Sequence, residues 1–256
     1  MSTAASDKAT PEKLTPVYGP TSEQPPLFDG TTRLYISYRC PFAQRVLITR
    51  NFKGLQDEIK LVPFNLRSRP DWYAEKVYSE NKVPSLEHNG KIMGESIDLM
   101  KYLDSNFEGP SLLPDDATKK QFAEELLEYT DTFNGNVYAA FKGDVVSDVG
   151  PAVDYLEDAL SKYSGPFFLG DQFSLADIAY IPFIERFEIF LSEVYQYNIT
   201  EGRPNLAAWI QDINKLESYN LTKQIDPKEV VEYYSLRFLV IFFNQNTQAY
   251  VSYTSI

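Results

Sequence analysis

The order of the hydrophobic patterns divides this sequence into two parts of different fold class. Segments with strand composition occur at 33–38 and 59–64, and a helical pattern follows each of them. Two short strands then flank Asn89-Gly90, a strong hairpin signal because both turn residues must adopt positive φ. A helix at 97–107 completes the order β-α-β-α-β-β-α, which predicts a mixed sheet covered by helices.

Beyond residue 117 the hydrophobic residues recur only at helical spacing. They advance by threes and fours through Phe122, Leu126, Tyr129, Phe133, Val137 and Phe141. Ser174 and Asp177 have the spacing of a capping box, which predicts that a buried helix begins after Ser174. We therefore predict an α/β domain at 30–109 and an all-helical domain at 110–237.

The two ends of the chain do not follow these patterns. Residues 1–29 are rich in Pro, Ser and Thr and have no apolar period, which predicts a flexible N-terminal arm. No charged residue occurs after Arg237, so we interpret 238–256 as an atypical, uncharged C-terminal extension. The alternative is a last helix that docks on the core.

Scarce residues and net charge exclude several kinds of site. Cys40 is the only cysteine and His88 the only histidine, which excludes an internal disulfide and a zinc site made of these residues. We expect His88 to be solvent-exposed, because it lies in a polar turn. The formal charge of −12 opposes binding to nucleic acid. Because no apolar run approaches the ~20 residues that cross a bilayer and no targeting signal is evident, we expect a cytoplasmic protein without a membrane partner.

Cys40 is the candidate reactive residue because it precedes Pro41 where a strand gives way to a helix. Proline suits the first helical position, which places Cys40 at the N-cap. The free N–H groups and partial positive charge there favour a thiolate and lower a thiol pKa from ~8.5 to ~3.5–7.5. Arg39 and Arg45 add positive potential, so we predict a reactive thiol. The alternative is an inert buried cysteine.

Position 43 determines how a disulfide at Cys40 would be resolved. A dithiol oxidoreductase places its second cysteine there, whereas this chain has Ala43. A mixed disulfide at Cys40 would therefore need an external thiol, and glutathione is the natural candidate.

Three further segments suit a peptide thiol. Val83-Pro84 before a strand predicts a cis-proline turn in which the backbone of Val83 pairs with an extended ligand. Glu95-Ser96 at a helix start offers sites for a ligand ammonium and carboxylate. Arg69 and Lys82 are candidates for a second carboxylate.

These motifs resemble those of the glutathione transferase superfamily, and more narrowly its cysteine-type plant lambda class, which is related to the omega and dehydroascorbate reductase classes. The resemblance covers about 28–237 and rests on the segments 38–45, 81–86, 94–96, 168–171 and 174–177. It implies an α/β plus all-α protein with a thioredoxin-like N-terminal domain followed by an all-helical C-terminal domain. It also implies that Cys40 forms the mixed disulfide with glutathione, with Pro84 as the cis-proline. The residues implied to bind glutathione are Phe42, Arg69, Lys82, Val83, Pro84, Glu95 and Ser96.

A cysteine in place of the usual Tyr or Ser implies thiol transfer or deglutathionylation with weak conjugating activity. We expect glutathione as co-substrate, no metal, small hydrophobic or aromatic thiol adducts as substrates and, from the resemblance, a monomer. One alternative is a non-catalytic carrier of aromatic metabolites such as flavonoids, with the run Tyr180 to Phe190 lining its pocket. Another, weaker alternative is a membrane-inserting relative of the intracellular chloride channel proteins, which share the Cys-Pro-Phe motif.

Overall fold

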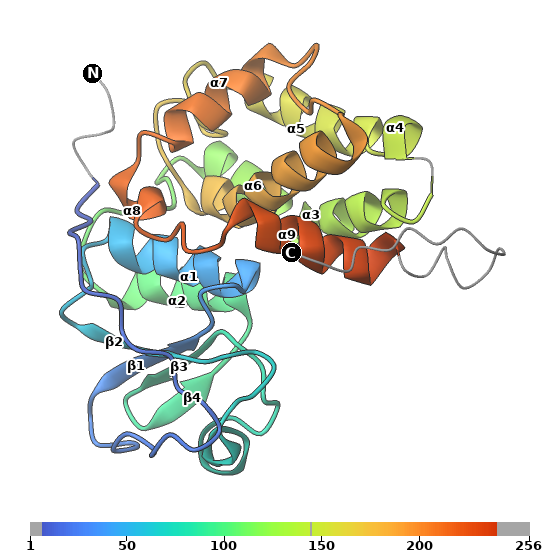
Figure 1. Cartoon of the computed structure of the whole chain (residues 1–256). Helices are drawn as coiled ribbons and strands as arrows, with labels where there is room; N and C mark the ends of the chain where they lie inside the picture. Colours follow the sequence, from blue (N-terminus) through green and yellow to red (C-terminus); the bar gives the residue numbers. More distant parts are fainter. Residues whose placement is uncertain (1–6, 144, 240–256) are drawn as a thin grey trace, which may run out of the picture.

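A four-stranded mixed sheet forms the base of the N-terminal domain in the computed structural model, which describes residues 7–143 and 145–239 (Figure 1). Its strands are β1 (Thr32–Ile36), β2 (Ile59–Pro63), β3 (Ser85–His88) and β4 (Lys91–Met93), in the order β2-β1-β3-β4. The pair β1 and β2 is parallel, whereas β3 is antiparallel to both β1 and β4. Asn89 and Gly90 have positive φ values of 51° and 71°, as the hairpin prediction required.

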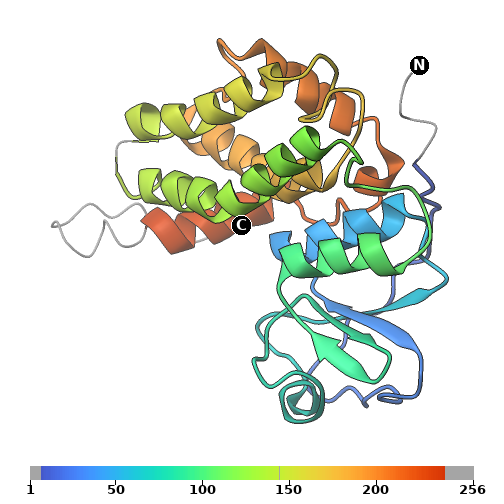
Figure 2. The same ribbon diagram turned by 180° about the vertical axis from the view of Figure 1, so that it is seen from behind.

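The two faces of this sheet are covered differently. Leu34 and Ile36 of β1 point to the face covered by α1 (Pro41–Phe52) and α2 (Ser96–Asn106) and join the main core there. Tyr35 between them points to the other face, where a second cluster includes Phe64 and the five-residue π-helix η2 (Tyr73–Val77). Helices α1 and α2 lie between the sheet and the C-terminal domain in both views (Figures 1 and 2).

Among its described residues, the C-terminal domain consists of helices joined by loops and contains no β-strand. Its elements are α3 (Ala117–Ala140), α4 (Val145–Asp148), α5 (Gly150–Ser161), α6 (Leu175–Tyr195), α7 (Pro204–Ile213), α8 (Glu217–Asn220), α9 (Pro227–Tyr234) and η3 (Ser235–Leu239). Helix α6 begins with the predicted capping box of Ser174 and Asp177. It packs against α1, α3 and α9 and is therefore the central helix of the molecule.

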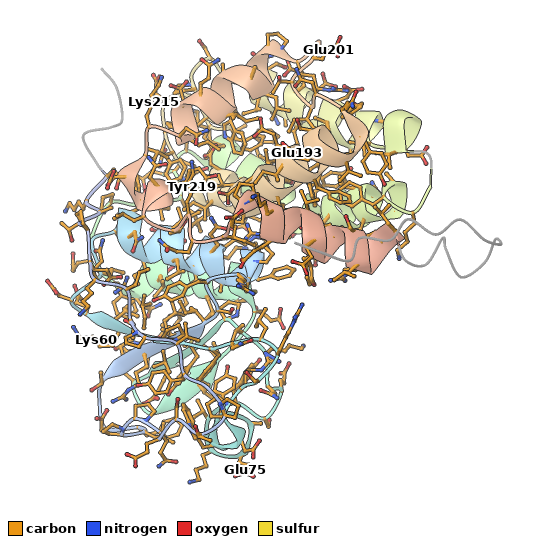
Figure 3. All side chains as sticks on the ribbon, viewed as in Figure 1. Lys60, Glu75, Glu193, Glu201, Lys215 and Tyr219 are labelled. Carbon is orange, nitrogen blue, oxygen red and sulfur yellow. The ribbon has the colours of Figure 1, made fainter. Side chains whose placement is uncertain are left out.

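The two domains share one continuous hydrophobic core, to which α1, α6 and α8 contribute. Tyr219 of α8 is buried at this boundary, whereas the labelled charged residues Lys60, Glu75, Glu193, Glu201 and Lys215 lie on the surface (Figure 3). Because α1 directly follows Cys40, the packing of α1 on α6 places the cysteine near the domain boundary.

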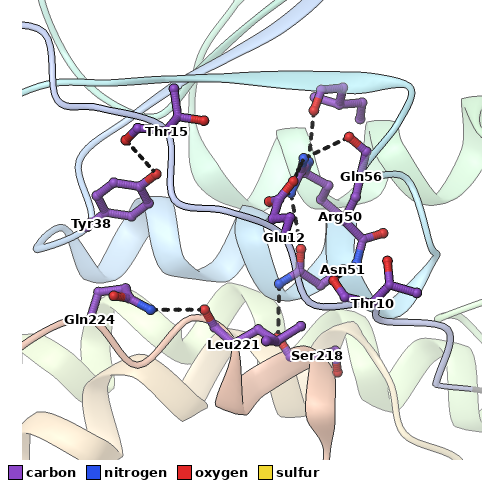
Figure 4. A network of polar contacts seen from close by, with 11 residues as sticks. Thr10, Glu12, Thr15, Tyr38, Arg50, Asn51, Gln56, Ser218, Leu221 and Gln224 are labelled. Atoms are coloured by element: carbon purple, nitrogen blue, oxygen red, sulfur yellow. Dashed lines mark hydrogen bonds and ion pairs between the residues drawn. The ribbon is translucent and has the colours of Figure 1, made fainter.

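Residues 7–29 differ from the predicted flexible arm, because they lie along both domains and bind them through polar contacts. The Glu12 carboxylate accepts two hydrogen bonds from Arg50, at 2.6 and 3.0 Å, and the Arg50 side chain is 1% exposed (Figure 4). The Asp7 carboxylate accepts from the backbone N–H and hydroxyl of Ser218 at 3.1 and 3.0 Å. Polar contacts of this kind do not require apolar residues at regular spacing, so the hydrophobic pattern of the sequence could not predict them. Residues 1–6 lie outside the described residues.

The same segment covers the second face of the sheet. The Tyr18 N–H donates to the carbonyl of Pro63 at 2.8 Å, and the Tyr18 ring packs edge-on against Phe64 and Trp72. The indole N–H of Trp72 in turn donates to the carbonyl of Ser22 at 2.9 Å. The N-terminal segment thus covers part of this face.

Two other sequence expectations need correction. Phe238, assigned to the atypical extension, is buried, and its ring stacks on Tyr138 at 5.3 Å. The chain up to Leu239 therefore fits the alternative of a docked last helix, and residues 240–256 lie outside the described residues. His88 is half-buried instead of exposed, because its Nδ1 lies 2.8 Å from the Tyr102 hydroxyl and its ring packs on Phe107.

Candidate active site at the start of helix α1

Cys40 occupies the position that the sequence predicted. It is the N-cap of α1, with extended backbone dihedrals of −84° and 118°, and Pro41 stands at the helix start. The backbone N–H groups of Phe42 and Ala43 interact with the sulfur and favour its thiolate. A strand, a sharp turn and a proline-initiated helix thus hold the sulfur at the end of α1.

The predicted low pKa of Cys40 is wrong in direction. Its side chain is 7% exposed, and this burial raises the thiol pKa above its ordinary value, more than the two N–H groups and nearby arginines lower it. The arginines that lower it are Arg186 and then Arg45, whereas Arg39 is not among the leading causes. The thiol itself donates a weak hydrogen bond to the Val83 carbonyl at 3.7 Å, which further suits the neutral form. Sequence reasoning missed the effect because burial depends on tertiary packing.

A cavity of about 760 Å³ opens beside Cys40. One wall is the loop from Ser37 to Phe42, a second is the segment after β2, and a third is helix α9 with η3. Tyr138 of α3 and Arg186 of α6 also line the cavity. The volume lies within the ~300–1,000 Å³ of small-molecule sites, so a drug-sized substrate fits next to the sulfur.

The peptide bond between Val83 and Pro84 is cis, as the sequence predicted. Nearby, Lys82 Nζ lies 2.9 Å from a Glu80 oxygen and 3.8 Å from a Glu95 oxygen, and the Lys82 and Glu95 side chains are exposed. Glu95 precedes α2 with a φ of 65°, a backbone conformation that residues other than glycine rarely adopt. The structure thus brings Lys82 and Glu95 together beside the cis-proline and leaves both accessible to a ligand.

Ser96 has a different environment from the one we expected. It is buried, and its hydroxyl accepts a hydrogen bond from Arg45 Nη1 at 3.1 Å. Arg45 also donates to the Ala179 carbonyl at 2.9 Å, while its buried Nη2 has no partner among the described residues. Burial lowers the pKa of Arg45 to about 10. Arg45 therefore connects the start of α2 to α6, in addition to its effect on Cys40.

The remaining predicted residues lie at the edges of the site. The Phe42 side chain is 40% exposed and packs edge-on against Phe183 at 5.2 Å. Arg69 is half-buried and close enough to Tyr73 to lower the pKa of that hydroxyl, although burial makes the net change an increase. Of the residues predicted to bind glutathione, only Phe42 lines the cavity.

Sequence reasoning missed three polar residues at the cavity: Tyr138, Arg186 and Tyr234. Arg186 is the most informative, because it is the one cation within the apolar run from Tyr180 to Phe190. A buried charge in such a run signals a specific role. The aromatic residues of that run belong to the core and do not line the cavity, which corrects the expected pocket lining.

Comparison with known proteins identifies the family of this chain. The model of the "Glutathione S-transferase, N-terminal domain" matches residues 34–111, and that of the "Glutathione S-transferase, C-terminal domain" matches residues 121–212. Glutathione S-transferase L3 of Arabidopsis thaliana is 63% identical over 220 residues, which cover 86% of this chain and 93% of that protein. The chain belongs to the glutathione S-transferase family.

Two further relatives support this assignment. Glutathione S-transferase L2, chloroplastic, of Arabidopsis thaliana is 59% identical over 218 residues, which cover 85% of this chain and 74% of that protein. The crystal structure of glutathione transferase Omega 2C from Trametes versicolor matches with a TM-score of 0.67 at 28% identity, covering 82% of this chain and 99% of that one. The names of the plant relatives agree with the predicted lambda class.

The family assignment fixes the coarse function and the fold. This glutathione transferase has the predicted thioredoxin-like domain followed by a helical domain, and both predictions are confirmed. It belongs to an enzyme family with glutathione-dependent transferase activity, for which glutathione is the co-substrate. The individual roles of Cys40 and of the predicted glutathione contacts remain predictions.

The described residues offer neither a cluster of metal ligands nor a membrane-spanning helix. Residues 7–143 and 145–239 contain no group of three or more His, Cys, Asp or Glu side chains placed to hold a metal ion. Over the same residues, no helix combines the length and hydrophobicity needed to span a bilayer.

Proposed function

We propose that this glutathione transferase removes glutathione from mixed disulfides through Cys40. The Cys40 thiolate attacks the glutathione sulfur of a substrate disulfide, a Cys40–glutathione disulfide forms, and the substrate leaves as a thiolate that takes up a proton. The thiolate of a second glutathione then attacks the glutathione sulfur bound to Cys40, which releases oxidised glutathione and regenerates Cys40. The net reaction consumes one free glutathione: its sulfur is oxidised into the disulfide of oxidised glutathione, while the substrate sulfur is reduced to a thiol.

The observation that supports this proposal most directly is the position of the only cysteine. Cys40 lies at the N-cap of α1, beside a cavity of substrate size, with Ala43 one turn further along. Because no second cysteine is available to resolve the disulfide, a one-cysteine cycle driven by external glutathione is the exchange chemistry that fits the chain.

The raised pKa of Cys40 affects the rate of this cycle and not its feasibility. At neutral pH a smaller fraction of Cys40 is ionised than of free cysteine, because burial penalises the charged form. The N–H groups of Phe42 and Ala43 and the charges of Arg186 and Arg45 stabilise the thiolate once it forms. A thiolate of higher pKa is also a stronger nucleophile, which partly compensates for its smaller population.

The proposal is tested with the mixed disulfide of glutathione and 2-mercaptoethanol as substrate. We expect turnover by the wild type and a loss of at least about 100-fold in Cys40→Ser, because serine cannot form the covalent intermediate. Incubation with oxidised glutathione should add one glutathione to Cys40, detected by peptide mass spectrometry. Retained turnover in Cys40→Ser would refute the mechanism.

Weak conjugation is the second part of the proposal. Conjugation of glutathione to 1-chloro-2,4-dinitrobenzene should be slow in the wild type, because the Cys40 thiol reacts with sulfur instead of stabilising a bound glutathione thiolate. Cys40→Ser should conjugate faster, since a hydroxyl can donate a hydrogen bond to that thiolate. Faster conjugation by the wild type than by Cys40→Ser would contradict this part.

We also propose that the region around the cis-proline binds glutathione. The glutathione backbone would pair with Val83 next to Pro84, and the glutathione ammonium group would contact Glu95. Lys82 and Arg69 would be available to a glutathione carboxylate. The accessible Lys82–Glu95 pair near the cis-proline, and the Val83 carbonyl 3.7 Å from the Cys40 sulfur, support this placement. Glu95→Gln should raise the KM for glutathione about tenfold, by loss of a charged hydrogen bond. The control is Glu75→Gln, an exposed residue of η2.

A non-catalytic carrier of aromatic metabolites is the second candidate function. The volume of the cavity and the raised pKa of Cys40 favour it, since a carrier needs space and no thiolate. Cys40→Ser should then bind a flavonoid as tightly as the wild type while mixed-disulfide reduction is undetectable in both proteins.

Location and assembly also remain predictions. We expect a cytoplasmic monomer, although one relative is named chloroplastic. A fluorescent fusion tests the location, and sedimentation velocity tests the assembly.

A further inference from the structure

The cavity beside Cys40 is positively charged on a protein that is strongly acidic as a whole. Four arginines line it, Arg39, Arg67, Arg186 and Arg237, against the two acids Glu229 and Glu232, while the whole chain carries −12. Arg39 is paired with Glu229 at 2.5 Å, which leaves three arginines and one acid. A concave site with an excess of one charge concentrates ligands of the opposite charge, so the charges that line this cavity favour anions.

Arg186 brings a guanidinium to the inner part of the cavity. Its side chain is 3% exposed, and Nη1 donates to Gln44 at 2.6 Å and to the Pro182 carbonyl at 2.7 Å. Glu185 approaches Nη1 at 3.5 Å but does not line the cavity. Nη2 makes one long hydrogen bond, 3.4 Å, to the Arg39 carbonyl among the described residues. Because Nη2 carries two protons, it can donate to a further acceptor.

A tyrosine hydroxyl near Arg186 also lacks a well-formed hydrogen bond. The Tyr234 side chain is 3% exposed, and its buried hydroxyl has no well-formed hydrogen bond to any described residue. It interacts with the Tyr138 hydroxyl, toward which it acts as the donor, and the two rings meet edge to face at 6.1 Å. Burial raises the pKa of both hydroxyls, whereas the positive charge of Arg186 lowers it by a smaller amount. Both hydroxyls therefore remain protonated donors at neutral pH. Arg186 Nη2 and the hydroxyl pair of Tyr138 and Tyr234 therefore line one cavity with more donor protons than the described residues accept, and a buried hydroxyl without a well-formed hydrogen bond, such as that of Tyr234, is rare in folded proteins.

The remaining surroundings suit a flat ring. The loop side of the cavity contributes Tyr38 and Phe42, and the helical side contributes Tyr138 and Tyr233. Aromatic walls with a few polar groups at one end are typical of sites that orient an aromatic ligand.

We propose that Arg186, Tyr138 and Tyr234 bind an anionic oxygen on the aromatic, non-glutathione half of the substrate. This inference rests on the proposed function, because it assigns the cavity to the thiol that Cys40 releases. Lys82, Val83 and Glu95, which we propose for glutathione, do not line the cavity and leave it free for that half. The three residues are specificity determinants, and the preferred substrates are aromatic thiol adducts that carry a carboxylate, sulfonate or phenolate.

Binding of two matched fluorescent probes tests the subsite without catalysis. The anionic probe is 1-anilinonaphthalene-8-sulfonate, and the neutral probe is N-phenyl-1-naphthylamine, which lacks only the sulfonate. We expect Tyr234→Phe to weaken binding of the anionic probe about tenfold, since a hydrogen bond to a charged acceptor contributes ~1.5 kcal/mol or more. Binding of the neutral probe should change less than about twofold, because phenylalanine preserves the ring.

A control variant and a second test variant keep this experiment decisive. Tyr155→Phe removes a half-buried hydroxyl from a ring that packs on Tyr129 and does not line the cavity. It should leave both affinities unchanged. Tyr138→Phe should weaken anionic binding in the same way as Tyr234→Phe, and it serves if Tyr234→Phe does not fold. Equal affinity of Tyr155→Phe and both test variants for the anionic probe would overturn the proposal, as would an equal loss for both probes.

Kinetics separate this proposal from the proposed function. The substrates are glutathione disulfides of 4-mercaptobenzoic acid and of its methyl ester, so the distal group is a carboxylate in one and a neutral ester in the other. We expect the wild type to have a KM about tenfold lower for the acid, and Tyr234→Phe to abolish that preference. Turnover of both substrates with equal KM would refute the subsite and leave thiol transfer intact. Turnover of neither would refute thiol transfer, and the probe affinities would still decide the subsite.

Discussion

The ion pair between Glu12 and Arg50 tests whether the N-terminal segment is bound to the folded protein. Replacing Glu12 with Gln removes the negative charge and one of two acceptors, while Arg50 keeps its bonds to the Ile59 and Gln56 carbonyls at 2.9 and 3.0 Å. A hydrogen bond to a charged group contributes ~1.5–3 kcal/mol. Water can partly replace the lost acceptor because the Glu12 side chain is 37% exposed. We therefore expect Glu12→Gln to lower the free energy of unfolding by about 1.5 kcal/mol, the lower end of the range.

Equilibrium unfolding in urea measures this effect. With a slope of about 3 kcal/mol/M, the midpoint should fall by about 0.5 M. Trp72 contacts the N-terminal segment and Trp209 lies in the helical domain, so variants that keep one tryptophan report on each domain separately. The control is Lys13→Gln, which removes one charge from the exposed neighbouring residue. A midpoint no lower for Glu12→Gln than for Lys13→Gln would mean that the segment is free in solution, as its composition had suggested.

Three further predictions concern titration and buried polar groups. Alkylation of Cys40 by iodoacetamide should accelerate with pH about a midpoint above the ~8.5 of free cysteine, and a midpoint below 7 would contradict the burial argument. Burial raises the pKa of Asp177 from 3.8 to about 6, so the folded state binds this proton more tightly than the unfolded chain. The contribution of Asp177 to stability should therefore fall by about 2 kcal/mol between pH 4 and pH 7, and Asp177→Asn should lack this decrease in urea titrations at several pH values. Glu87→Gln should cost about 2–4 kcal/mol in thermal or urea unfolding, because buried Glu87 accepts from the Tyr35 hydroxyl and from the Phe28 N–H, both at 2.6 Å; a change below about 0.5 kcal/mol would refute it.

The features predicted correctly from the sequence are those that depend on neighbouring residues. Cys40-Pro41 specified an N-cap and a helix start, Asn89-Gly90 specified a hairpin, and Ser174 with Asp177 specified a capping box. In each case the dihedral preferences of two to four consecutive residues determine the structure. Hydrophobic periodicity likewise separated the two domains, because it records which side of each element is buried.

The features missed depend on residues far apart in the chain. The burial of Cys40, which reverses the predicted change in its pKa, results from packing that no local motif encodes. Tyr138, Arg186 and Tyr234 come from three different helices and meet only in the folded protein. Ser96 was predicted to bind a ligand because a serine at a helix start usually exposes its hydroxyl, but Arg45 reaches it from another helix.

Helix α9 both packs into the core and lines the cavity beside Cys40. Val230, Tyr234 and Phe238 recur every four residues and are buried, and the first two also line the cavity. Glu229, Glu232 and Tyr233 line the same cavity from the more exposed side of α9. Substitutions on the exposed side can diversify which compounds are accepted at little cost in folding. The buried row has no such freedom, so related enzymes should differ in ligand preference first at those outward positions.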